Sequence, residues 1–224
     1  MMGLSWADVW KLVHDERQRL VDDLQSLDGS LWETPSLCRG WAVHDVVAHL
    51  LDSAETGRAA FVVSMLRARG DFHRANQNGV DKVKRDDPRQ TLEAFRQVQE
   101  LRRTPPAHRA TRLVEAIVHG EDIRRPLGLT GSYPRIGVHD ALAYQIRTSV
   151  KFDGGRERAD QFRLTDTDSG VSWGDGPEVT GRAVDLLLVV SGRRVNPDLL
   201  GGPGAQRMLQ GARGLDAKGS ADDA

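Results

Sequence analysis

The 224-residue chain is predicted to be an α+β protein, with an N-terminal antiparallel four-helix bundle followed by a small α+β domain. In the first 130 residues, apolar side chains recur at three- and four-residue steps over several long segments, which indicates amphipathic helices. From about residue 131 the pattern changes to short alternating segments separated by turn residues, which indicates strands. We therefore expect a helical domain over residues 1–130, an α+β domain over residues 131–214 and a disordered tail over residues 215–224.

Four helices are predicted in the first domain, at residues 5–28, 41–69, 88–101 and 110–127. Ser5 and Asp8 have the spacing of a helix cap, Pro88 is a typical first helical residue, and Gly128 is a natural helix end. The polar segment 71–87 lies between the second and third helices, and its turn is expected at residues 76–79. Connections of moderate length between helices of this size favour an antiparallel bundle.

The second domain is predicted from shorter signals. Residues 138–150 have helical spacing, and residues 161–166 alternate between apolar and polar side chains. Asp168-Ser-Gly170 separates that segment from residues 171–173, which predicts a hairpin. A further short strand is expected at residues 178–180, followed by a buried helix over residues 183–190 that ends before Gly192.

A candidate metal site is suggested by residues 112–127 of the fourth predicted helix. Glu115 and His119 lie four residues apart and Asp122 three further on, so all three project from one edge of that helix. A carboxylate and an imidazole one turn apart can bind the same divalent ion, but a third ligand must come from another element. His49 is the best candidate, although a buried histidine with a neutral hydrogen-bond partner is the alternative interpretation. Two histidines and one carboxylate leave coordination positions open, which is typical of a catalytic site.

Four segments occur in an order that carries a resemblance to a known family: residues 35–50, 112–128, 176–181 and 186–193. They resemble the mycothiol-dependent maleylpyruvate isomerase family, which belongs to the DinB-like metalloenzyme group. The resemblance implies that His49, Glu115 and His119 are the metal ligands. Two imidazoles and a carboxylate suit zinc best, although nickel, iron or manganese would also fit. The resemblance also implies a DinB-like bundle, a sterol-carrier-like second domain and mycothiol as the thiol cosubstrate.

The activity implied by this resemblance is that of an S-transferase or isomerase. A metal-activated thiolate would attack a small electrophilic substrate. Two other classes remain open, a metal-dependent hydrolase that activates water and a non-catalytic protein that binds metal or a small ligand. The same metal ligands could activate either a thiol or a water molecule.

Further residues are assigned roles around this site. Asp122 is expected to orient His119 or a bound water and so to take part in catalysis, with a surface pair to Arg125 as the alternative. The resemblance implies that Arg193 and Arg194 hold the thiol cofactor or an acidic substrate, with Arg193 also a catalytic candidate; arginines at a helix end also serve the helix dipole without any ligand. Cys38 is interpreted as a structural thiol, and the other five histidines as surface or packing residues, namely His14, His44, His73, His108 and His139.

The amino-acid composition limits the kinds of partner expected for this protein. With 31 basic and 32 acidic residues there is no charge bias toward nucleic acid or an anionic membrane, so a small-molecule partner is expected. No apolar run reaches the roughly 18 residues of a membrane span, and the amino terminus does not have the pattern of a signal peptide. We expect a cytoplasmic protein, as monomer or homodimer. Its single cysteine excludes an intramolecular disulfide and a multi-cysteine zinc site.

Overall fold

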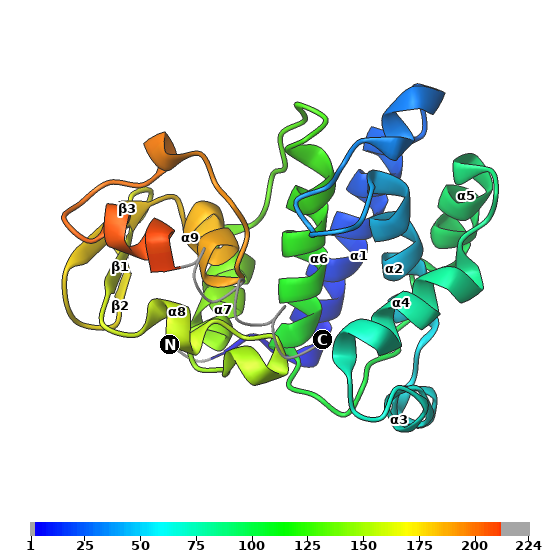
Figure 1. Cartoon of the computed structure of the whole chain (residues 1–224), viewed down its shortest axis with the longest axis horizontal. Coiled ribbons are helices and arrows are strands. Elements are labelled where there is room, and N and C mark those ends of the chain that lie inside the picture. Colours follow the sequence, from blue (N-terminus) through cyan, green and yellow to red (C-terminus); the bar gives the residue numbers. More distant parts are fainter. Residues whose placement is uncertain (1–2, 212–224) are drawn as a thin grey trace. The chain divides into compact units, whose positions relative to one another are not determined.

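The computed structural model describes residues 3–211, and the predicted tail at residues 215–224 lies outside them. The chain divides into two compact units, residues 4–132 and residues 133 onward, each considered by itself below. The first unit is helical (Figure 1). Its α-helices are α1 (Trp6–Leu24), α2 (Val43–Glu55), α3 (Arg58–Arg67), α4 (Phe72–Val83), α5 (Pro88–Val98) and α6 (Ala110–Arg124).

Local signals set several of these helix ends as predicted. The Ser5 hydroxyl accepts a hydrogen bond from the Asp8 amide at 3.2 Å, and the Asp8 carboxylate accepts one from the Ser5 amide at 3.2 Å, so α1 begins with a capping box. The Asp87 carboxylate accepts from the Arg89 amide at 2.9 Å at the start of α5. Gly128 has φ +70° just after α6, a conformation that few residues other than glycine adopt.

The prediction of one long helix over residues 41–69 is wrong. The backbone becomes extended at Thr56 (φ −81°, ψ 110°) and Gly57 (φ −91°, ψ 178°), which separates α2 from α3. Thr56 is β-branched and Gly57 is a poor helix former, so this is the weakest point of the segment. No residue of α3 is buried, so its apolar side chains do not continue the core-facing surface of α2.

The turn expected at residues 76–79 is also wrong, because these residues lie inside α4. The Asp71 carboxylate caps this helix by accepting from the Arg74 amide at 3.0 Å. Ala75, Gly79, Val80 and Val83 form its buried face. Gly79 lies so close to α2 that a Cβ there would stand 2.4 Å from an Asp52 carboxylate oxygen. Burial of this face outweighs the turn preference of the Asn-Gln-Asn-Gly sequence.

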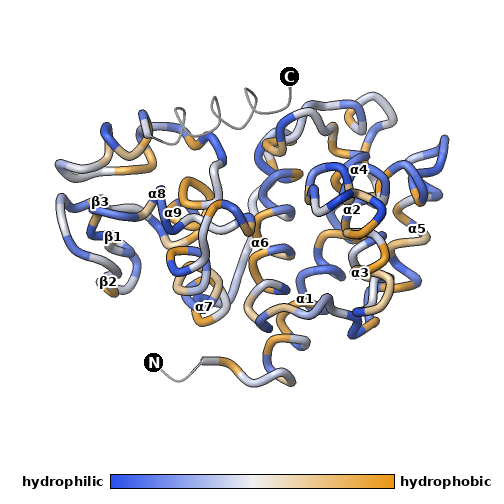
Figure 2. The backbone as a smooth tube through the Cα atoms, turned by 60° about the horizontal axis from the view of Figure 1, so that its bottom comes forward, coloured by the Kyte–Doolittle hydropathy of each residue, from blue (hydrophilic) through white to orange (hydrophobic). Residues whose placement is uncertain are grey.

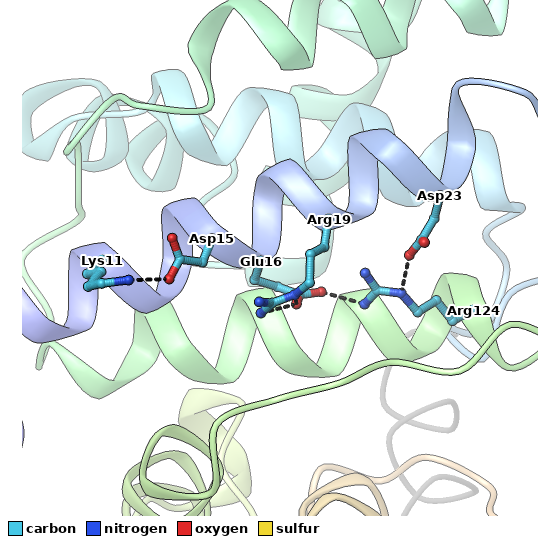
Figure 3. Close-up of polar contacts among 6 residues, drawn as sticks. All are labelled: Lys11, Asp15, Glu16, Arg19, Asp23 and Arg124. Atoms are coloured by element: carbon cyan, nitrogen blue, oxygen red, sulfur yellow. Dashed lines mark hydrogen bonds and ion pairs between the residues drawn. The ribbon is translucent and has the colours of Figure 1, made fainter.

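The helices around the core do not simply alternate in direction. Arg124 at the end of α6 bonds to Asp23 near the end of α1, so these two helices run the same way, as Figure 3 shows. His44 at the start of α2 bonds to Thr91 at the start of α5, so α2 and α5 also run the same way. The α3–α4 segment carries the chain back before α5 begins, which is why the alternation expected for an antiparallel bundle is not seen in these pairs.

The core of the first unit lies among α1, α2, α4, α5 and α6. Its buried residues include Leu20, Val47, Phe95 and Ile123, each no more than 1% exposed. Figure 2 shows hydrophobic and hydrophilic stretches along α6, which packs against α1 and α2.

The second unit combines helices with a small sheet. Its elements are α7 (Arg135–Gln145), α8 (Arg156–Ala159), β1 (Arg163–Asp166), β2 (Ser172–Trp173), β3 (Glu178–Gly181) and α9 (Ala183–Val190). The strand order is β2-β1-β3, with β1 antiparallel to β2 and parallel to β3, so the predicted hairpin is confirmed. The buried helix α9 packs against α7 and β1, and Asp166 of β1 accepts a hydrogen bond from the Ala183 amide at 3.0 Å at its first turn.

The described residues therefore form a mostly helical α+β fold. Within residues 3–211 no helix combines the length and apolar composition needed to cross a bilayer.

Candidate functional site

The helices α2 and α6 bring His49 and His119 into contact. They run in opposite directions, and the two imidazole rings meet edge to face with their centroids 4.8 Å apart. Val46 and Leu50 on either side of His49 are buried in the core, which turns His49 inward. Trp41, just before α2, covers the other side of this imidazole with a ring-centroid distance of 5.0 Å. Packing on both sides therefore fixes the orientation of His49.

Asp122 holds the second histidine. Its carboxylate lies 2.9 Å from His119 Nδ1 and its side chain is fully buried, whereas His119 is 14% exposed. With Asp122 ionised, Nδ1 carries the proton and donates it, which leaves Nε2 as the nitrogen that can bind a cation. The alternative partner considered for Asp122 is engaged elsewhere, since Arg125 donates to Glu121 at 2.6 Å. The catalytic role of Asp122 stays a prediction.

Glu115 faces a cluster of donors. Arg112, one turn earlier on α6, donates to both carboxylate oxygens, with N···O distances of 3.1 Å. Ser53, one turn after His49 on α2, donates to Glu115 Oε2 at 2.5 Å. Arg112 Nη1 also lies 3.1 Å from the Ser53 hydroxyl, which closes a three-residue cluster. We call Arg112, Ser53 and Glu115 the carboxylate clamp.

Arg112 and Ser53 are not among the site residues predicted from the sequence. Both carry a signal that could have been read, because each lies one helical turn from a proposed ligand: Arg112 from Glu115 and Ser53 from His49. Only the packing of α2 against α6 shows that the two signals point to the same carboxylate.

The clamp keeps Glu115 ionised. Burial is the largest single effect and would raise the pKa of this carboxyl, but Arg112, His49, Ser53 and Arg17 together outweigh it and hold the pKa below the ordinary value, with Arg112 contributing most. Glu115 is therefore a carboxylate at neutral pH, the form that binds a cation.

Arg17 of α1 is a further buried cation near Glu115. It is only 3% exposed and its Nη1 donates to the carbonyls of Gln99 and Leu101 at 3.2 and 3.1 Å. Arg17 and Glu115 both line a small cavity of about 10 Å³, with apolar walls from Leu20, Leu50 and Phe95. This space is near the minimum for one water molecule.

The donor chemistry of His49, Glu115 and His119 fits a divalent cation, since two imidazoles and one carboxylate form a donor set that suits zinc. In the part of the chain that the structure describes, no three His, Cys, Asp or Glu side chains stand together in a metal-binding arrangement. The two histidines are adjacent, while both oxygens of Glu115 face Arg112 and Ser53.

The other predicted site residues lie apart from this cluster in the sequence. Arg193 and Arg194 belong to the second unit, directly after α9; Arg193 donates to the Ser191 carbonyl at 3.0 Å and Arg194 is exposed. Their role as thiol-binding residues stays a prediction. Cys38 is partly buried before α2 and packs against the core of the first unit, in line with a structural thiol.

Four of the remaining histidines make local contacts, and one of them, His108, accepts a hydrogen bond from the Ala110 amide at 3.2 Å. His14 lies 3.1 Å from Glu100, His44 lies 2.9 Å from Thr91, and His139 lies 2.8 Å from Asp166. These contacts fit the packing roles expected for them.

The fold and the cluster define a class: a helical unit that carries two histidines and a carboxylate on facing helices, followed by a small α+β unit. Residues 13–111 match the family model described as the mycothiol maleylpyruvate isomerase N-terminal domain. The matched residues lie within the first unit, and the resemblance to this family that was predicted from the sequence is confirmed. The matched range includes His49 and ends before Glu115 and His119.

Solved structures agree on the fold. A crystal structure of the mycothiol-dependent maleylpyruvate isomerase superposes with a TM-score of 0.62 over 92% of this chain and 97% of that chain, at 16% identity. A histidine-to-alanine mutant of a mycothiol-dependent maleylpyruvate isomerase gives the same TM-score and coverage at 15% identity. Among curated proteins no sequence match is found.

Proposed function

We propose that the protein is a mycothiol-dependent enzyme, an isomerase or S-transferase that acts on a small electrophilic substrate with a divalent cation held by His49, Glu115 and His119. The observation that carries the proposal is the contact between His49 and His119 across α2 and α6, with Asp122 on Nδ1 of His119. The match of residues 13–111 to the family model and the fold shared with the isomerase structures support it.

We further infer that α1, α2, α5 and α6 are the four helices of a DinB-like bundle. Ligands on the facing helices α2 and α6 would then project into the bundle interior. The second unit is proposed to be the sterol-carrier-like domain and to contribute Arg193 and Arg194 to binding of the thiol or an acidic substrate.

Each residue has a defined task in this proposal. Asp122 keeps the proton on His119 Nδ1 and so presents Nε2. Trp41 packs on His49, which restricts rotation of the ring and access of water to it. Glu115 is kept as a carboxylate by its neighbours. When bound, a divalent cation, most simply zinc, would supply a positive charge that lowers the pKa of a thiol. A thiolate would then form near neutral pH.

The proposal is tested with His49→Gln, which keeps most of the side-chain volume and removes one ligand. Purified full-length protein should contain about one ion per chain by elemental analysis and should conjugate a chlorinated bimane only when mycothiol is added. The variant should stay folded by circular dichroism and lose both properties together. His44→Gln is the matched control, since His44 is also buried on α2 but bonds to Thr91.

The outcomes separate the classes that the sequence leaves open. Bound metal with thiol-independent turnover would favour a hydrolase, and bound metal without turnover would favour a binding protein. Normal metal content in His49→Gln would show that the third ligand lies elsewhere and would refute the proposed site.

A further inference from the structure

The carboxylate clamp uses the same atoms that a cation would need. Arg112 and Ser53 together donate to both oxygens of Glu115, and the Arg112 side chain is only 6% exposed. These contacts use three of the roughly four lone-pair positions of the carboxylate. A cation that binds it through both oxygens therefore displaces at least one of these hydrogen bonds, and the most strongly held partner is the bidentate guanidinium.

The charges around Glu115 also oppose a cation. Arg112 and Arg17 are both buried positive charges that act on this carboxylate, and Arg17 is only 3% exposed. Buried charges are screened much less than exposed ones, so both repel a divalent ion at the site. The negative charge of Glu115 is already offset before any cation arrives.

We propose that Arg112 is an internal competitor for the divalent cation: its guanidinium binds Glu115 in the cation-free protein and releases it when the cation binds. This inference rests on the proposed function and concerns how that site is regulated. Arg112 acts through Glu115 and is a positioning residue. Its effect is to weaken cation binding, so that the site exchanges its ion more readily than the three donors alone would allow.

Removal of a supporting residue and removal of a competing residue change metal affinity in opposite directions. A residue that merely supports a ligand from the outer shell lowers metal affinity about 10–100-fold when it is removed. A competitor raises affinity when it is removed. The direction of one measured change therefore separates the two roles.

The test measures zinc affinity of the full chain by competition with a chromophoric chelator. Arg112→Met removes the charge and keeps the apolar stem, and it should bind zinc about tenfold more tightly, the equivalent of one charge-assisted hydrogen bond. Arg112→Lys keeps the charge without the bidentate fork and should fall between that variant and the unaltered protein. Arg125→Met is the matched control, because Arg125 pairs with a glutamate on the same helix that is not a proposed ligand, and its affinity should not change.

A second measurement is made on the unaltered protein. In the unaltered protein the Nε–Hε resonance of Arg112, assigned by its loss in Arg112→Lys, should shift on zinc titration, while that of Arg124 should not. Equal or weaker zinc binding by Arg112→Met, or no shift of Arg112 despite zinc binding, overturns the inference. Absence of zinc binding in every variant and in the unaltered protein overturns the proposed function itself, whereas binding that is lost in His49→Gln leaves that function standing.

Discussion

Replacement of Arg124 by methionine should destabilise the first unit far more than loss of a surface charge. Arg124 is 1% exposed and joins α6 to α1 through Glu16 and Asp23 (Figure 3). Methionine keeps most of the apolar stem, so the change mainly removes the charge. The Glu16 carboxylate, whose side chain is 3% exposed, then loses its principal partner.

The expected loss of stability depends on the contacts that Glu16 and Asp23 keep when Arg124 is removed. Breaking a buried ion pair by removing one member costs about 3–5 kcal/mol, because a charge is left buried and uncompensated. Arg19 still donates to the other oxygen of Glu16 at 3.0 Å, and Asp23 is 36% exposed and can be hydrated. We therefore expect the low end of that range, about 3 kcal/mol, against a total stability of about 5–15 kcal/mol for a typical domain.

The matched control is Lys11→Met, which removes a pair on the same helix α1 whose members are 74% and 43% exposed. Such an i,i+4 surface pair contributes about 0.3–0.5 kcal/mol. Urea unfolding is followed by tryptophan fluorescence in a Trp173→Phe background, because the four remaining tryptophans all lie in the first unit. The signal then reports that unit alone, which avoids averaging over two units that can unfold separately.

The pH dependence tests the cause. Burial raises the pKa of Glu16, and Arg124 is the main group that lowers it, so removal of Arg124 raises it further. A carboxyl whose pKa is higher in the folded state favours folding when it is protonated and loses that contribution as the pH rises through the folded pKa. The loss of unfolding free energy in Arg124→Met should therefore shrink toward acid pH. Adding Glu16→Gln to that variant should restore part of the lost stability at pH 7. A cost equal to that of Lys11→Met, or one independent of pH, would refute the reasoning.

Three further predictions concern other parts of the molecule. Ser5→Ala removes the hydroxyl of the α1 cap and should cost about 1 kcal/mol in the same fluorescence assay, whereas Ser5→Asn should retain most of it. Gly155→Ala should destabilise the second unit by about 1–3 kcal/mol in thermal unfolding, since the new Cβ would stand 2.3 Å from the Val190 carbonyl oxygen; an unchanged melting temperature would contradict that packing. Burial opposes ionisation of Asp166, yet hydrogen bonds from Ser169, His139 and two backbone amides hold its pKa below the ordinary 3.8. Asp166→Asn should therefore lower the stability of the second unit at pH 7. This loss of stability should become smaller as the pH drops below about 4. A pH-independent deficit would show that the carboxylate charge is not what stabilises the unit.

Features that depend on a few neighbouring residues could be predicted from the sequence. The capping box at Ser5, the Pro88 start of α5, the Asp168-Ser-Gly170 turn and the helix end at Gly192 are each local. Their physical cause, a side chain that bonds a nearby amide or a glycine with positive φ, acts within one turn of chain. The i,i+4 relation of Glu115 and His119 belongs to the same class.

Other features depend on the packing of distant segments, and only the tertiary structure decided them. Residues 76–79 read locally as a turn, yet burial of the Gly79 face against α2 makes them helical. The shared direction of α1 and α6 follows from the route that α3 and α4 take around the core, which no local pattern encodes. The site also joins residues that are far apart in the sequence. His49 contacts His119, and Ser53 donates to Glu115 across 62 positions. Which donors meet a buried carboxylate is decided by the register between two packed helices, and that register arises only when the whole core is assembled.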